Sequence, residues 1–170
     1  MVKAGTSVTV TPVRKAHLPS LHRAFEAIAG RRRYFVRTQA PSRGRLRKIV
    51  LDADKRDLPF YVAVDEGEVV GWVSIAFPTI ESLDHSGTLN MGVLPEYRRR
   101  GIGDRLLESA VSHAFRDGNR WRVQLEVFGD NAAAMALYEK HGFRVEGVAR
   151  KAVCLDGTFH DVVHMARLKG

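Results

Sequence analysis

The sequence predicts an α/β fold with a mixed central sheet, and its patterning supports that class. Short runs of alternating apolar and polar residues predict strands, whereas apolar residues that recur every three or four positions predict helices. These runs follow one another in the order β-α-α-β-β-β-α-β-α-β-β. Tight turns between successive strands predict antiparallel neighbours, and the strand, helix, strand succession from Met91 to Val127 predicts one parallel pair.

The first part of the chain contains one strand and two helices. Residues 7–13 alternate valine with small polar residues, which is typical of a half-buried strand. Helical spacing of apolar residues predicts helices over 17–29 and 45–55. Between the helices, residues 31–44 have no clear period and are rich in arginine, so we predict a basic loop.

Three strands and the longest helix come next. Residues 60–64 and 69–77 are apolar runs joined by a tight turn at 66–67, as in a hairpin. Residues 87–94 form a further strand, in which Gly92 indicates a bulge or a close backbone approach. A continuous apolar stripe then predicts a helix that begins near Gly103.

The last elements are a strand, a helix and two strands. Their predicted positions are a strand over 121–128, an alanine-rich helix between an N-cap at Asn131 and a C-cap at Gly142, and strands near 143–149 and 159–168. The chain has no internal repeat and no linker-like segment, so residues 1–170 are expected to form a single domain.

Composition excludes several classes of protein. No run reaches the roughly 18 apolar residues of a membrane span, and the N-terminal segment lacks the apolar block of a secretory signal, so a cytoplasmic location without a membrane partner is expected. The single cysteine, Cys154, cannot form an internal disulfide. No cluster of Cys and His has the spacing of zinc ligands, so no metal is expected.

The charge balance points to an anionic partner. The net charge is +8 and the isoelectric point is near 10.1. Nucleic acid, an acidic membrane surface and a small polyanion such as a nucleotide cofactor are all compatible with this charge. Composition alone does not choose among them.

The segment "LPEYRRRGIGDRLL" at residues 94–107 has the features of a pyrophosphate site. It joins a strand to a helix start, where unpaired backbone N–H groups and the helix dipole favour anions. Gly101 and Gly103 have no Cβ that would keep a phosphate from those groups, and the arginines add attraction. Neither a P-loop nor a dinucleotide fingerprint fits "GIGDRL". The alternative is an exposed charge run.

Two blocks of the chain resemble the GNAT superfamily of N-acetyltransferases. The segment "GVLPEYRRRGIG" is similar to its acetyl-CoA-binding signature, with Arg98, Gly101 and Gly103 at the signature positions. The later block "LEVFGDNAAAMALYEKHGFRVEG" resembles the family's next strand and helix, with Asn131 and Tyr138 at its characteristic positions. The resemblance covers the chain well from about residue 60 onward. It implies a mostly antiparallel sheet of about seven strands flanked by about four helices.

The resemblance implies an acyltransferase that uses acetyl-CoA as acyl donor. Backbone groups of the strand near Gly92 would face the pantetheine arm and the thioester, and the amides after it would bind the pyrophosphate. The implied cofactor-binding residues are Met91, Gly92, Val93, Arg98, Arg99, Arg100, Gly101, Ile102, Gly103, Asp104, Asn131 and Tyr138.

Two of these residues also have a simpler explanation. Tyr138 matches the family's tyrosine that protonates the departing CoA sulfur, but on an alanine-rich helix it also suits a packed core aromatic. Asn131 matches a pantetheine contact and also a helix cap, and both roles are compatible because a cap uses only the side-chain oxygen.

The base that takes the ammonium proton is the least determined group. Candidates within sequence reach are Glu126, Glu81, Asp84 and His85, of which Glu126 is the catalytic candidate. Glu126 lies between Leu125 and Val127 on a strand, so it faces the opposite side from both, toward either the cleft or solvent.

The resemblance implies that Tyr34, Phe35 and Arg37 in the basic loop contact the substrate. The alternative interpretation is that this segment is only a mobile surface loop. An arginine-rich rim favours a primary amine that also carries an acidic group, so an amino acid or related small acid is the expected acceptor, attacking the thioester directly. Protein N-termini or lysines are the alternative acceptors.

Two functions of another class are also compatible with the sequence: a non-catalytic CoA-binding sensor and a nucleic-acid-binding module. No nucleic-acid motif accompanies the basic clusters. A homodimer is the expected assembly.

Overall fold

The structure is a computed structural model that describes residues 8–31, 33 and 39–170. Its strands are β1 (Thr9–Pro12), β2 (Phe60–Asp65), β3 (Glu68–Ala76), β4 (Ser86–Val93), β5 (Arg122–Phe128), β6 (Arg144–Leu155) and β7 (Thr158–Leu168). Its α-helices are α1 (Leu18–Ala29), α2 (Arg43–Lys55), α3 (Ile102–Arg116) and α4 (Ala132–Lys140). The expected order of strands and helices is confirmed, with two short 3-10 turns added, η1 (Lys15–His17) and η2 (Pro95–Tyr97).

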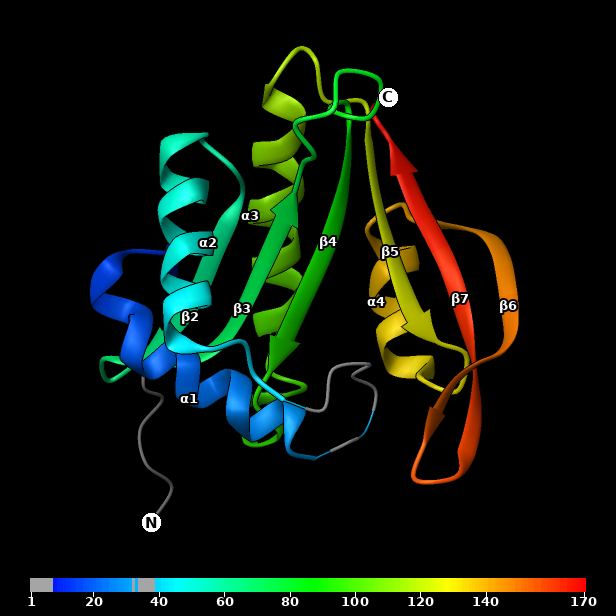
Figure 1. Cartoon of the computed structure of the whole chain (residues 1–170), viewed down its shortest axis with the longest axis horizontal. Helices are drawn as coiled ribbons and strands as arrows, with labels where there is room; N and C mark the ends of the chain where they lie inside the picture. Colours follow the sequence, from blue (N-terminus) through cyan, green and yellow to red (C-terminus); the bar gives the residue numbers. More distant parts are fainter. Residues whose placement is uncertain (1–7, 32, 34–38) are drawn as a thin grey trace.

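The seven strands form one mixed sheet in the order β1-β2-β3-β4-β5-β7-β6 (Figure 1). Every neighbouring pair is antiparallel except β4 and β5, which run parallel. The predicted parallel pair is therefore confirmed, and it lies in the middle of the sheet.

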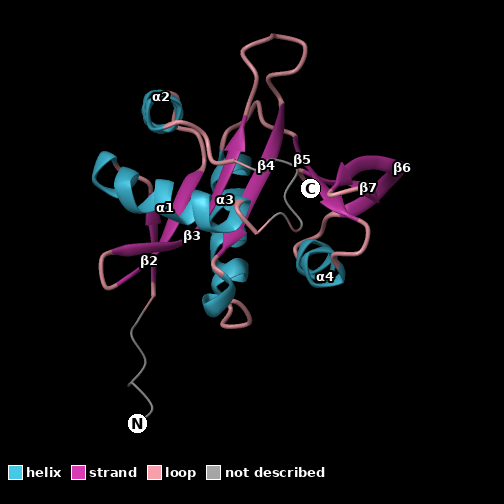
Figure 2. Ribbon diagram, turned by 60° about the horizontal axis from the view of Figure 1, so that its bottom comes forward, coloured by secondary structure: helices cyan, strands magenta, loops and turns pink. Residues whose placement is uncertain are grey.

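Helices cover both sides of the sheet's first half (Figure 2). On one side, α3 packs its apolar stripe against Val73, Ile75 and neighbouring side chains of the central strands. On the other side, α1 and α2 pack against Trp72 and parts of β2. Because β3 is buried on both faces, its sequence is almost continuously apolar rather than alternating.

The turns agree with the glycines that predict them. Glu66 and Gly67, between β2 and β3, both have positive φ angles of 47° and 83°, as a two-residue hairpin turn requires. Gly142 has a φ of 82° just after α4, where a left-handed residue ends the helix.

The β6 strand differs from its expected length. Residues 143–149 were the predicted strand, whereas β6 continues to Leu155. The pairing of β6 with β7 is irregular between Ala149 and Val153, where Lys151 has a φ of 51°. Such a bulge shifts the alternation of side chains, so the strand pattern is lost from the sequence although the strand continues.

Within the described part of the chain, no helix is both long and apolar enough to span a bilayer.

Candidate active site

The parallel strands β4 and β5 separate partway along their length. They pair at Ser86 with Arg122, Gly87 with Val123 and Thr88 with Gln124. Beyond these pairs, β4 continues beside β3 to Val93, and β5 continues beside β7 to Phe128. Figure 1 shows the two arrows diverging toward their C-terminal ends. We call this divergence beyond Thr88 and Gln124 the fork; the backbone groups of β4 that face it have no β5 partner there.

Gly92 lies on the β4 side of the fork and makes a close approach. A Cβ at this position would lie 2.7 Å from the Cη2 atom of Trp72, whose side chain is fully buried. The pairing of β3 with β4 continues without a register shift past Gly92, so the alternative of a bulge is wrong. The glycine is needed because an indole ring lies against the strand.

The loop after β4 presents backbone amides at the open end of the fork. Arg99 and Gly101 have positive φ angles of 60° and 73°, and Gly101 is the N-cap of α3. In the described chain, the first amide of α3 to donate to a backbone carbonyl is that of Arg105, which donates to Gly101 over 3.2 Å. Among the described residues, the amides of 99–104 have no backbone carbonyl partner, so they suit an anion.

Arg98 holds this loop against the end of β4. Its Nε donates to the carbonyl of Val93 over 2.9 Å, so that carbonyl is already used within the chain. Burial, followed by the nearby charge of Arg31, lowers the pKa of the Arg98 guanidinium. The guanidinium stays charged at any physiological pH, and an anion bound beside it would offset part of the cost of its burial and of its repulsion from Arg31.

The remaining signature residues have mainly structural contacts. Arg100 lies over the ring of Tyr97, 5.1 Å from its centroid. Gly103 lies against α4, because a Cβ there would be 3.2 Å from the Cδ2 atom of Leu137 and 3.8 Å from the Cε atom of Met91. The close packing of α3 on α4 therefore adds a second reason for the glycine at 103.

The side chain of Asp104 joins the start of α3 to the end of α4. Its Oδ1 accepts hydrogen bonds from Lys140 Nζ over 2.6 Å and from His141 Nε2 over 3.1 Å. These bonds, that from Lys140 foremost, lower the pKa of Asp104. The carboxylate is thus committed to α4, and a cofactor contact at this position would come from the backbone amide.

Asn131 is the N-cap of α4. Its Oδ1 accepts a hydrogen bond from the amide of Ala134 over 3.3 Å, which confirms the predicted cap. The side-chain amide nitrogen is not used by the cap and keeps its two N–H donors.

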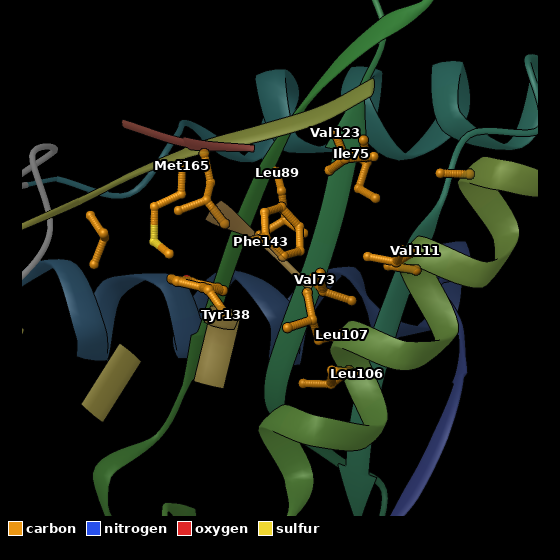
Figure 3. Packing of buried hydrophobic residues seen from close by; sticks show 14 of the residues in the cluster. Val73, Ile75, Leu89, Leu106, Leu107, Val111, Val123, Tyr138, Phe143 and Met165 are labelled. Carbon is orange, nitrogen blue, oxygen red and sulfur yellow. The ribbon is translucent and has the colours of Figure 1, made fainter. Parts of the chain in front are cut away.

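Tyr138 is part of the core. It is 8% exposed and its ring centroid lies 5.9 Å from that of Phe143. Figure 3 shows it among buried side chains that include Met165 and Phe143. Burial raises the pKa of Tyr138 to about 12. The hydroxyl is therefore protonated at neutral pH. Tyr138 packs in the core, as one of its two explanations predicted, and it also keeps a proton that it could donate.

Glu126 lies at the fork, on the face of the sheet away from α3 and α4. Its neighbours Leu125 and Val127 pack in the core with α3, so the carboxylate points to the opposite face, where its side chain is 61% exposed. We call this surface of β5 and β7 the open face. Glu126 comes two residues after the last β4–β5 pair, at Gln124, and is level with Asn90 of β4. Of the two orientations predicted for it, the exposed one is found, at the place where the strands part.

The other base candidates lie just before β4, at the end where β4 and β5 are paired. The carbonyl of His85 accepts hydrogen bonds from the amides of Trp121 and Arg122, and Glu81 and Asp84 precede it in the same turn. From Ser86 to the open end of the fork, β4 extends about 23 Å. The structure thus does not bring these three residues to the fork.

Some expectations lie outside the described structure, and others were missed. The predicted substrate contacts Tyr34, Phe35 and Arg37 are outside the described residues. His164 on β7 and Asn90 on β4 face the open side near Glu126, and the period-two patterns of "VVHMAR" and "TLNMGV" carry that signal. Among the described residues, no three His, Cys, Asp or Glu side chains gather as metal ligands.

The family assignment follows from a match over most of the chain. Residues 21–143 match the model of the acetyltransferase (GNAT) family. The chain belongs to the GNAT family. It is an acyltransferase of the N-acetyltransferase type.

Relatives of this GNAT chain differ in the acceptor that their names state. The L-amino acid N-acetyltransferase of Escherichia coli (strain K12) is 30% identical over 121 residues, which cover 69% of this chain and 72% of the relative. An N-alpha-acetyltransferase of Saccharolobus solfataricus is 37% identical over 121 residues, covering 65% and 69%. A phosphinothricin acetyltransferase of Sinorhizobium meliloti, solved in complex with acetyl-CoA, has a TM-score of 0.87 at 22% identity and covers 96% of this chain and 89% of its own.

Proposed function

We propose that this GNAT protein transfers the acetyl group of acetyl-CoA to the primary amine of an amino acid or a related small acid. The observation that carries the proposal is the fork. Its open end holds the amides of residues 99–104 at the start of α3, which have no backbone carbonyl partner in the described part of the chain. The unpaired edge of β4 leads directly to the anion site formed by these amides. This arrangement suits a long ligand that has a reactive group at one end and a pyrophosphate further along.

The chain offers groups that could contact both the pyrophosphate and the pantetheine arm of acetyl-CoA. When bound, acetyl-CoA would supply an activated acetyl thioester. The amides of residues 99–104 would hold the pyrophosphate, with Arg98 and Arg31 adding positive charge. The fork-facing backbone of Met91 and Gly92 would lie along the pantetheine arm, and the amide of Asn131 would contact it from α4. The residues present therefore fit this cofactor.

Protons are handled from two sides of the fork. Glu126 on the open face accepts the proton of the incoming ammonium, which frees the amine for direct attack. Tyr138, protonated because of its burial, donates its proton to the departing sulfur. The two groups lie on different sides of the sheet, so the acceptor and the CoA approach from opposite faces.

The acceptor class rests on charge and on the relatives. The net charge of +8 favours an acceptor with an acidic group over a polyamine. The relative from Escherichia coli is an L-amino acid N-acetyltransferase by name. The second candidate function is acetylation of protein N-termini, which the 37% identical N-alpha-acetyltransferase supports.

A thiol-release assay tests the proposal. The purified protein is given acetyl-CoA with amino acids, with polyamines or with short peptides, and the free thiol of CoA is measured. We expect amino acids to be the best acceptors and acetyl-CoA alone to raise the melting temperature. A stronger signal with peptides would favour the second candidate. Absence of a thermal shift would rule out the cofactor site, and a shift without thiol release from any amine would indicate a non-catalytic CoA sensor.

A further inference from the structure

His164 lies beside Glu126 on the open face. The two residues are directly paired across β5 and β7, and His164 Nδ1 lies 3.6 Å from Glu126 Oε1. Both side chains are accessible, at 45% and 61% exposure, so either can turn to close the remaining distance or bridge it with one water. The next strand places Gly147 beside His164, so the paired residue of β6 adds no side chain over the imidazole.

A second carboxylate near His164 is already neutralised. Glu146 lies in the register shift of β6 between Val145 and Gly147, and both of its oxygens accept hydrogen bonds from Arg122. These bonds lower the pKa of Glu146, with a smaller contribution from the charge of His164. Arg122, Glu146 and Glu126 are charged groups of β5 and β6 near His164, and among the described residues the carboxylate of Glu126 has no ion pair with a lysine or arginine.

Chemistry favours a histidine beside the carboxylate at this point. Free carboxylic acids titrate near pH 4 and free imidazoles near pH 6.5, so an imidazole retains a proton far better at neutral pH. A base is most effective when it titrates close to the working pH. A carboxylate that can pass its proton to an imidazole combines access to the ammonium with this capacity.

We propose that His164 is a positioning residue that receives, through Glu126, the proton taken from the acceptor ammonium. The proposal rests on the proposed function. The N–H bond of the ammonium breaks, Glu126 takes the proton, His164 Nδ1 accepts it and the imidazolium releases it to solvent. The second N–H proton leaves after the carbon–nitrogen bond forms and replaces the one that Tyr138 gives to sulfur. The sum is one amide, one thiol and one released proton.

The test is the pH dependence of kcat in a His164→Asn variant. At saturating acceptor and acetyl-CoA, we expect kcat at pH 7 to fall about tenfold and the acidic limb of the profile to move down by about one unit or more, toward the carboxylate range. The dissociation constant of acetyl-CoA should stay unchanged, because His164 lies on the opposite face from α3. In a His164→Ala variant, added imidazole should restore part of the activity, since the site is open.

Two controls separate this role from a structural one. His85→Asn makes the same substitution just before β4, five residues or about 17 Å from the level of Asn90 and Glu126, and should keep the wild-type profile. Adding His164→Asn to Glu126→Gln should cost little more than Glu126→Gln alone, because the two residues act as a unit. An unchanged profile in His164→Asn, or additive losses in the double variant, overturns the role of His164 alone. Absence of thiol release by the wild-type protein overturns the proposed function itself.

Discussion

Two glycines show how much the local surroundings decide at the scale of one residue. A methyl group at Gly92 would meet the buried Trp72 ring at 2.7 Å and Ile28 at 3.1 Å, whereas a methyl group at Gly44 in α2 would meet nothing within 4 Å. The first glycine is therefore required by packing. Packing does not require the second glycine, which only gives the unfolded chain more conformational freedom at that position.

Gly92→Ala should destabilise the protein, and Gly44→Ala should stabilise it. The first change overpacks the core beside the fork and should lower the free energy of unfolding by about 1–3 kcal/mol. The second should raise it by about 0.4–1 kcal/mol, because alanine restricts the unfolded chain and favours the helix. Urea unfolding of the two variants measures both. Equal effects of the two changes would contradict the packing at Gly92.

Tyr138→Phe should reduce turnover while cofactor binding is retained. Phenylalanine keeps the packing against Phe143 but removes the proton that Tyr138 holds at neutral pH. We expect kcat to fall about a hundredfold, with the dissociation constant of acetyl-CoA changed by less than about threefold. Steady-state kinetics and calorimetric titration measure the two quantities. A variant with wild-type kcat would show that Tyr138 serves only the core.

Residue identities that follow from local rules were predictable, and those that depend on register were not. The cap at Asn131 and the turn glycine at Gly67 follow from backbone preferences of a few residues. Strand alternation also gives the face of Glu126. That Glu126 lies level with Asn90 at the fork depends on how residues 36 positions apart in sequence pair across β4 and β5, which no local pattern encodes.

At the scale of elements, α3 and α4 are joined at the site by the Asp104 cluster. Lys140 and His141 come from the end of α4, and Asp104 comes from the first turn of α3, where a negative charge also suits the helix dipole. The same two helices carry the loop amides and Asn131. Their relative position therefore decides whether both parts of the site face one ligand.

Asp104→Asn should make stability less dependent on acid pH. The hydrogen bonds from Lys140 and then His141 lower the pKa of Asp104, so its contribution is present above the titration range of an unfolded aspartate and is lost as the pH falls through the folded pKa. Because the side chain is 37% exposed, the contribution should stay below about 1 kcal/mol. Unfolding in urea at pH 7 and pH 3 measures it. The wild type should lose more stability than the variant between the two values.

The prediction of one strand was too short where the chain departs from a regular period. The strand expected to end at 149 continues to Leu155 because the bulge near Lys151 breaks the alternation. Likewise, Glu81, Asp84 and His85 are close to β4 in sequence but lie at its opposite end from the fork. Distance along the chain does not show which end of a strand becomes a site.

At the scale of the whole molecule, the net charge of +8 should matter for binding. CoA carries several phosphate charges, and exposed arginines around residues 98–100 attract them through solvent that salt screens. We expect the dissociation constant of acetyl-CoA to rise roughly tenfold between 0.05 and 0.5 M salt. Calorimetry checks this, with a short acetyl thioester that lacks phosphates as the control. A salt-independent affinity would contradict binding led by charge.

The expected homodimer stays a prediction, which light scattering of the purified protein would test.

The fork also makes the sheet mechanically uneven. Strands β1 to β4 and strands β5 to β7 meet along the three residue pairs that close the fork, so this line is a seam between two better-connected halves. A ligand lying in the fork would touch both halves and act as a clamp across the seam. We therefore expect backbone amides of β6 and β7 to exchange with heavy water more slowly once acetyl-CoA is bound, although neither strand contacts it. Uniform protection of the whole sheet, or none, would show that the halves already move as one body.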